Sequence, residues 1–207
     1  MRKTLFALVA ILILPLSFVM MGCSNNDQNT TKSNPRIIIH TTQGNIIVDL
    51  YYNVAPNTVR NFLYLASNGF YDGTIFHRVG PNFMIQGGCP LGTGTGNPGH
   101  RIRCETTSNN HPNNIAHERG VLSMAHAGRN TGGSQFFIMT GTATLLNGVH
   151  TAFGRVAYGM EYVDAIARQP GVPLDQWGST FRPSVEQQIT GITIETFGHT
   201  FDAPDKI

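Results

Sequence analysis

The chain has 207 residues, a formal net charge of +2 and only 13% charged residues. Its 14 basic and 12 acidic residues are too evenly balanced to indicate a nucleic acid as the natural partner, and its 23 glycines favour a turn-rich β protein over a helical bundle. The length suits one domain of ordinary size, with a sizeable core, and an appendage.

The N-terminus is typical of bacterial secretion signals. Two basic residues precede an almost wholly apolar run at residues 5–21, so residues 1–22 are predicted to be a signal peptide. Gly22 and Cys23 resemble a lipoprotein processing site, at which the cysteine is lipidated and becomes the new N-terminus, although the two methionines before them depart from the usual motif. The alternatives are simple secretion and an uncleaved transmembrane anchor, for which the apolar run is at the short edge.

Residues 23–34 are polar and are predicted to act as a flexible tether for the domain that follows. The domain is therefore expected in the bacterial cell envelope, on the periplasmic side, and attached to a membrane by the lipid on Cys23 or by the anchor. The serine after this cysteine resembles lipoproteins of the outer membrane more than those of the inner membrane.

A hairpin and a helix open the domain, which is predicted to span residues 35–198. Residues 36–42 and 45–51 are rich in β-branched side chains and flank a turn signal, which predicts the hairpin. Pro56 then takes its favoured place in the first turn of a helix, and Asn68-Gly69 is predicted to end that helix as a left-handed cap. The apolar side chains of the helix recur at helical spacing and face a core: Val59, Phe62, Leu63 and Ala66.

The stretch that surrounds Arg78 combines one cation, one amide and large apolar side chains. A turn at Gly80-Pro81 follows Arg78, and Phe83, Met84 and Gln86 leave that turn. Alternation in a strand places Met84 and Gln86 on one face, and strand twist could still bring Phe83 to the same rim. The stretch predicts an apolar slot with one positive charge and one amide. Because it holds no nucleophile, paired carboxylates or metal cluster, it excludes most hydrolytic chemistry.

A glycine-rich loop follows, and Gly94-x-Gly96-x-x-Gly99 has the letters of a dinucleotide-binding loop. Such a loop should open a helix, whereas Pro98 interrupts this one and the strand-like residues 100–105 come next. We predict a surface loop whose glycines need positive φ, and no cofactor. The eight histidines of the chain lack zinc-type spacing, so no metal is predicted.

Two cysteines, Cys89 and Cys104, bracket this loop. In an oxidising compartment such a pair could form a disulfide, and two free buried thiols are the alternative. Closing a loop of this size would contribute about 3 kcal/mol in the chain-entropy model. Counting free thiols under denaturing conditions decides between the two.

The remaining elements point to a closed barrel. Residues 111–120 and 169–187 are predicted to be irregular, residues 142–147 a short helical turn, residues 160–167 a second helix and residues 199–207 a tail that wraps or frays. About eight short strands and two helices without a βαβ rhythm favour a closed eight-stranded antiparallel barrel plugged by two helices, because closure removes sheet edges. The further strands are predicted at residues 74–78, 83–86, 121–126, 135–139, 151–156 and 188–195.

A second signature stretch runs from Gly120 to Thr140 and contains Ser134-Gln135-Phe136-Phe137. Together with the earlier Arg78-x4-Phe83-Met84-x-Gln86, at this distance, it resembles the two signature segments of the cyclophilin family of peptidyl-prolyl isomerases. The similarity extends from about Pro35 to about Thr196, which is nearly the whole mature chain. It implies an eight-stranded barrel capped by two helices and isomerase activity on X–Pro bonds.

Isomerisation needs no acid or nucleophile. The cis/trans barrier of a peptide bond is about 18–20 kcal/mol because resonance gives the C–N bond double-bond character. A catalyst must favour the twisted amide, and Arg78 could donate to the proline nitrogen or to the carbonyl oxygen as the bond rotates. Gln86 and the backbone at His126 would hold the flanking peptide groups. An apolar socket for the proline ring is predicted from Phe83, Met84, Phe137 and Leu146.

Similarity to cyclophilins places further residues around the same groove, and each has an ordinary alternative. Taken singly, the apolar residues could be plain core, Gln86 a surface amide and Arg78 a surface ion-pair partner, but their joint spacing favours a site. An acid–base role for the histidines has no support from a carboxylate or serine at a matching motif. The catalytic candidates are Arg78, Phe83 and Gln86, and the substrate-binding candidates are His77, Met84, Ala125, His126, Ala127, Gln135, Phe137, Leu145, Leu146 and His150.

Two positions depart from the family pattern. Leu145 stands where human-type cyclophilins carry a tryptophan that, by resemblance, helps to bind cyclosporin, so weak cyclosporin binding with retained activity is expected. His126 replaces the usual asparagine in a role that is mainly that of its backbone. We predict a monomeric isomerase that acts on proline-containing polypeptides of the envelope. The alternative is a holdase chaperone that binds proline segments without turnover, and the presence of Arg78 favours the enzyme.

Overall fold

The computed structural model describes residues 33–176 and 178–207, which belong to one compact unit. The predicted signal peptide, the lipidation site at Cys23 and the tether up to residue 32 lie outside the described residues. Within the described ranges, no helix is both long and apolar enough to cross a membrane.

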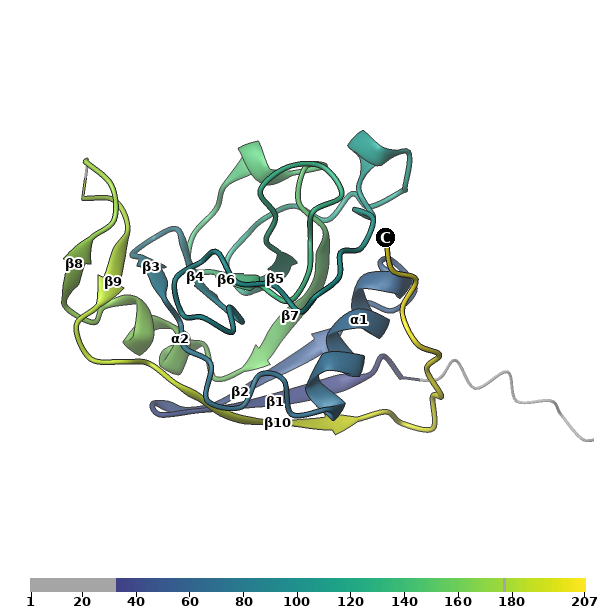
Figure 1. Ribbon diagram of the computed structural model, residues 1–207, viewed down its shortest axis with the longest axis horizontal. Coiled ribbons are helices and arrows are strands. Elements are labelled where there is room, and N and C mark those ends of the chain that lie inside the picture. The colour runs from purple at the N-terminus through teal and green to yellow at the C-terminus, as the bar shows by residue number, and fades with distance from the viewer. Residues whose placement is uncertain (1–32, 177) are drawn as a thin grey trace, which may run out of the picture. The chain divides into compact units, whose positions relative to one another are not determined.

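One antiparallel sheet forms the body of the domain (Figure 1), and its strand order is β10-β1-β2-β7-β5-β6-β4-β3-β9-β8. The predicted hairpin is confirmed, because β1 and β2 pair over their whole length. The strands are β1 (Arg36–Thr41), β2 (Gly44–Leu50), β3 (Arg78–Gly80), β4 (Met84–Gly87), β5 (Val121–Met124), β6 (Phe136–Met139), β7 (Ala152–Tyr158), β8 (Gly171–Pro173), β9 (Phe181–Pro183) and β10 (Ile189–Glu195).

The predicted closed eight-stranded barrel is wrong, because the sheet has ten strands and two ends, β10 and β8. The segment that would close the sheet, predicted as a strand at residues 74–78, is a strand only from Arg78 onward. Ile75 instead makes single bridges to Cys89 and to Gln188. One residue therefore spans the seam where a continuous ladder would be needed for closure.

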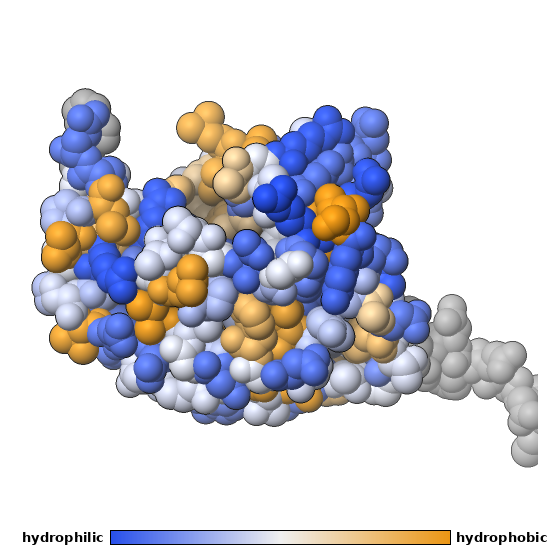
Figure 2. All heavy atoms as spheres, viewed as in Figure 1, coloured by the Kyte–Doolittle hydropathy of each residue, from blue (hydrophilic) through white to orange (hydrophobic). Residues whose placement is uncertain are grey.

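β8 and β9 were not predicted, and they lie in the stretch that was expected to be irregular. β9 joins the sheet through one register pair, Val79↔Phe181, and β8 pairs only with β9. These short strands contain two prolines and no alternation, so they lack the usual strand signal. Apolar residues gather over this hairpin at the left of Figure 2. Val172 of β8 and the following Leu174 are both exposed.

The first helix, α1 (Pro56–Ser67), begins and ends where predicted. The carboxylate of buried Glu105 accepts hydrogen bonds from the backbone N–H groups of Asn57 and Thr58, at 2.9 and 2.7 Å. These bonds satisfy two of the donors that a helix leaves open at its N-terminus. Gly69 has a φ of +67° and provides the predicted left-handed cap. The predicted apolar stripe is buried: Val59, Phe62, Leu63 and Ala66.

The second helix, α2 (Met160–Ala167), is also confirmed and packs near β2, β3 and β4. The C-terminal tail wraps around the domain and runs beside α1 (Figure 1). Arg60 of α1 binds Asp205 at 2.8 Å, and Arg101 and Ile207 exchange backbone hydrogen bonds. Two short 3₁₀ helices complete the fold: η1 (Thr107–Asn109) and η2 (Thr144–Leu146), the second at the predicted helical turn.

Both cysteines of the described residues are free and buried, so the disulfide between Cys89 and Cys104 is not formed. Each sulfur accepts hydrogen bonds in a setting of its own. Cys89 Sγ accepts from the N–H groups of Gly94 and Gly96, at 3.2 and 3.3 Å. Cys104 Sγ accepts from the N–H of Asn130 at 3.2 Å. Of the two alternatives, the structure has the free thiols.

Candidate functional site

A row of side chains crosses three neighbouring strands. Arg78 on β3 stands opposite Gln86 on β4, and Gln86 stands opposite Phe137 on β6. Opposed residues of antiparallel strands project to the same face of the sheet, so these three side chains share one face. Their neighbours Ile85 and Ile138 project to the other face and are fully buried in the core. Strand alternation therefore separates the candidate site from the core.

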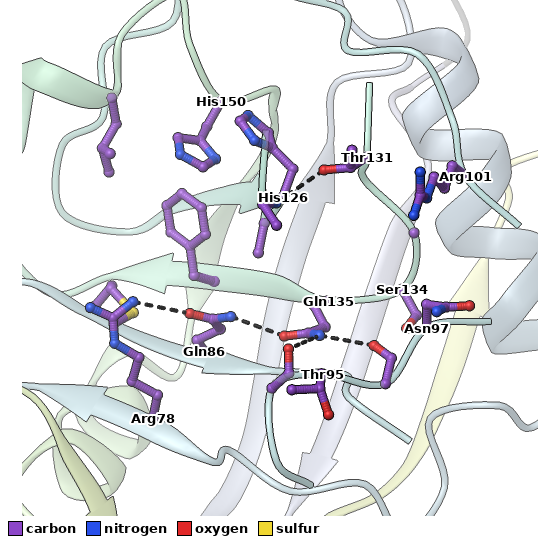
Figure 3. Close-up of a pocket in the computed structure, with 18 of the residues that line it drawn as sticks. Arg78, Gln86, Thr95, Asn97, Arg101, His126, Thr131, Ser134, Gln135 and His150 are labelled. Carbon is purple, nitrogen blue, oxygen red and sulfur yellow. Dashed lines mark hydrogen bonds between the residues drawn. The ribbon is translucent and has the colours of Figure 1, made fainter. Parts of the chain in front are cut away.

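A chain of polar contacts runs along this face (Figure 3). Arg78 donates from Nη1 to Oε1 of Gln86 at 3.4 Å, and Gln86 donates from Nε2 to Oε1 of Gln135 at 3.0 Å. Gln135 in turn donates to the carbonyl oxygens of Gly94 and Gly96, at 2.8 and 2.9 Å. The guanidinium, the two amides and the glycine-rich loop are thus held in one arrangement.

The turn between β3 and β4 brings Phe83 to the same rim. Phe83 N–H donates to the carbonyl of Gly80 at 3.0 Å, and Asn82 has a φ of +57°. Proline at the second position and a left-handed residue at the third are typical of a type II turn. The Phe83 ring lies beside the guanidinium, with its centroid 5.9 Å from Cζ of Arg78. The twist that could bring Phe83 and Met84 to one rim is confirmed, since both line the groove.

Histidine rings surround Phe137 on its far side. His117 stacks on Phe137 with centroids 5.9 Å apart, and His150 meets it edge-on at 5.4 Å. His126 stacks on His150 at 4.0 Å. Burial, helped by the neighbouring His126, lowers the pKa of His150 to about 4. His150 is therefore neutral at pH 7 and serves as an uncharged wall rather than as an acid.

These residues enclose a groove of about 540 Å³. All predicted site residues line it except His77 and Leu145. They are Arg78, Phe83, Met84, Gln86, Ala125, His126, Ala127, Gln135, Phe137, Leu146 and His150.

The two exceptions have simple physical reasons. His77 precedes Arg78 and points away from the groove; it is only 5% exposed, and burial lowers its pKa to about 4. It lies behind the glycine-rich loop, where a Cβ added to Gly94 would stand 3.3 Å from its Nε2. Leu145 is 90% exposed and projects to solvent, while its neighbour Leu146 lines the groove.

The polar side of the groove was not predicted from the sequence. The glycine-rich loop, predicted only as a surface loop, forms part of the wall because Gln135 binds its carbonyl groups. The glycines were the signal available in the sequence, because a Cβ at Gly94 would stand 3.3 Å from the ring of His77 and one at Gly96 would stand 3.0 Å from Leu91 and Pro90. The missed lining residues are Gly94, Thr95, Gly96, Asn97, Arg101, Thr131, Gly133 and Ser134.

The family model described as "Cyclophilin type peptidyl-prolyl cis-trans isomerase/CLD" matches residues 36–194, which include every strand that builds the groove. The chain belongs to the cyclophilin family. This cyclophilin is 60% identical over 114 residues to peptidyl-prolyl cis-trans isomerase B of Bacillus subtilis, with 55% of this chain and 77% of that protein covered. It is 54% identical over 130 residues to a peptidyl-prolyl cis-trans isomerase of Helicobacter pylori, with 62% and 77% covered.

A solved structure supports the same relationship. The cyclophilin-type isomerase of Cryptosporidium parvum, crystallised in the presence of the dipeptide Ala-Pro, superimposes with a TM-score of 0.68 at 35% identity. The match covers 77% of this chain and 98% of that one. The chain is thus a peptidyl-prolyl cis-trans isomerase of the cyclophilin type, as the two signature stretches predicted.

Proposed function

We propose that this cyclophilin accelerates X–Pro rotation in proteins of the cell envelope and that Arg78 stabilises the twisted amide. The observation that supports this mechanism is the setting of the guanidinium. It faces the groove, contacts Gln86 and the ring of Phe83, and has no acidic partner among the described residues. A guanidinium has five N–H donors, so donors remain for a lone pair that develops as the amide twists.

The rest of the groove would hold the peptide while one bond turns. The proline ring would enter the apolar part, where Met84 and Phe137 are buried and Phe83 and Leu146 stand at the rim. Gln86 would bind a flanking peptide group, because its own position is fixed by Arg78 and Gln135. Interactions that grow as the amide twists lower the barrier, whereas equal binding of both isomers does not.

Exchange spectroscopy of an X–Pro peptide tests the activity. Substoichiometric protein is expected to broaden and merge the cis and trans signals, because uncatalysed exchange takes tens to hundreds of seconds. A holdase would bind the same peptide, shift its signals and leave the cis/trans exchange rate unchanged. That second result would refute catalysis in the groove.

The envelope location is inferred from the N-terminal sequence, and lipidation of Cys23 is the feature that can be tested. In a bacterial host that processes lipoproteins, the chain is expected to incorporate radiolabelled palmitate and to sediment with the membranes. Cys23→Ser should lose the label while the isomerase activity of the domain is kept. Label that persists in Cys23→Ser, or a wild-type chain without label, contradicts lipidation at this residue.

The position of Leu145 leads to a prediction about cyclosporin binding. The wild-type groove is expected to bind cyclosporin weakly, since an exposed leucine stands at the position of the family's tryptophan. Leu145→Trp should tighten binding by about tenfold, because an added indole contact is worth on the order of 1–2 kcal/mol. Leu91→Trp is the control and should change nothing, because Leu91 is also an exposed leucine but neither of its sequence neighbours lines the groove, whereas Leu145 precedes the lining residue Leu146. Nanomolar affinity of the wild type in a titration would contradict the prediction.

A further inference from the structure

We propose that the groove prefers proline segments that carry a carboxylate side chain near the X–Pro bond, and that Arg101 recognises this carboxylate. The proposal rests on the proposed function, since it names the class of substrate for the same groove. It concerns the polar side of the groove, which the catalytic mechanism does not use.

The charge of the groove lining is one-sided. Its charged side chains among the described residues are two guanidinium groups, those of Arg78 and Arg101, and none of its lining residues is acidic. The two arginines stand on opposite sides of the pocket in Figure 3, with Gln86 and Gln135 between them. A cleft lined by one sign of charge attracts ligands of the other sign. If Arg78 faces the rotating amide, Arg101 is the cation left for a second ligand group.

Two lining residues on this side of the groove keep uncommitted donors, Asn97 and Arg101. Asn97 accepts the N–H of Gly99 at its Oδ1, at 2.9 Å, which leaves its amide N–H groups available. The hydroxyls of Ser134 and Thr131 already donate their hydrogens to the carbonyls of Gly88 and Gly128, so neither has a donor left for a ligand. The guanidinium of Arg101 has no hydrogen-bond or ion-pair partner within the described part of the chain. The free donors on this side of the groove, the Asn97 amide and the Arg101 guanidinium, suit a ligand that only accepts, and an ionised carboxylate is such a ligand.

The backbone under Arg101 is fixed. Arg101 exchanges hydrogen bonds with Ile207, at 2.9 and 3.4 Å, and the next residue, Ile102, is buried and bridges to Gly132 at the edge of the groove. The exposed guanidinium thus extends from an anchored segment beside the lining residues Gly133 and Ser134. The backbone of Arg101 is therefore held at the groove, and its unpartnered side chain can reach a ligand there. Arg103, two residues on, is also exposed but does not line the groove.

The test compares matched X–Pro peptides that carry Glu, Gln or Lys at one of two positions. These positions are the residue before X and the residue after proline, and each is varied in turn. With the full chain at low ionic strength, kcat/KM is expected to be about threefold to fivefold higher for Glu than for Gln at one of these positions, as for a partly exposed ion pair. The preference should shrink as salt is added. Arg101→Glu should reverse the order, so that the Lys peptide exceeds the Glu peptide. Arg103→Glu makes the same change of net charge and should keep the wild-type order.

The possible outcomes distinguish the preference for carboxylate-bearing peptides from the isomerase activity itself. Acceleration of the Gln peptide with no preference for Glu at any position overturns the inference and leaves the isomerase intact. A preference that Arg103→Glu reverses as strongly as Arg101→Glu also overturns it, because overall charge would then be the cause. No acceleration of the Gln peptide by the wild type overturns the proposed function, and the inference with it.

Discussion

Replacing Arg78 with alanine is expected to lower kcat/KM for X–Pro isomerisation by about 100- to 1000-fold, the usual cost of removing one preorganised transition-state donor. The loss should fall mainly on kcat. The groove would keep its apolar wall, so the ground-state peptide would still bind, while the twisted amide would lose the donor that favours it. Arg78→Lys keeps the charge but not the planar set of donors, and it should recover only part of the rate.

Arg168→Ala is the matched control for this experiment. Arg168 lies at the end of α2, its side chain is 70% exposed, and its contact with Asp164 is long, at 4.0 Å. The variant removes the same positive charge from the surface and should leave kcat/KM unchanged within about twofold, since such exposed pairs contribute little. Wild-type activity in Arg78→Ala would refute the role of the guanidinium, and an equal loss in Arg168→Ala would point to overall charge instead.

The local part of the site could be predicted because it depends on two short stretches. Strand alternation and the cross-strand register are enough to bring Arg78, Gln86 and Phe137 to one face, once β3, β4 and β6 are neighbours. The same rule could have removed His77 from the site, because it immediately precedes Arg78 and so projects to the other side.

The missed part depends on contacts between distant segments. Gln135 binds the carbonyl of Gly94, 41 residues earlier in the chain, and no local pattern specifies this bond. Arg101 belongs to the groove because its segment is held beside Gly132 and Ile207. The barrel was predicted to close because a closed sheet has no edges, but residues 74–77 supply one bridging residue rather than a strand. Pairings of this kind are tertiary and override local propensity.

Acidification from pH 7 to pH 5 is expected to destabilise the domain through its buried and half-buried histidines. Burial lowers the pKa of His77 to about 4, and it lowers the pKa values of His150, His117 and His100 as well. Each folded-state pKa lies below the unfolded value of about 6.5, so the unfolded chain binds more protons in the window between them. The stability that these groups contribute is therefore complete above pH 6.5 and is lost as the pH falls toward 4.

His77 should make the clearest contribution, since it is the less exposed of the two histidines whose pKa falls to about 4, His77 and His150. Its Nδ1 has no hydrogen-bond partner within the described residues. For a pKa of about 4 against 6.5, its share between pH 7 and pH 5 is about 2 kcal/mol of unfolding free energy. The lowered pKa of Asp164, held down by Arg119, keeps that carboxylate ionised throughout this window, so it adds nothing to the change.

Urea unfolding followed by circular dichroism, at constant ionic strength, measures this loss. The wild type should lose several kcal/mol between pH 7 and pH 5, and His77→Leu should lose about 2 kcal/mol less, because it has no proton to take up at that position. His40→Gln removes a partly exposed histidine from β1 and is the control. If His77→Leu and the wild type lose stability equally, then His77 accepts a proton in the folded state, and the buried neutral ring behind the glycine-rich loop is the wrong description of it.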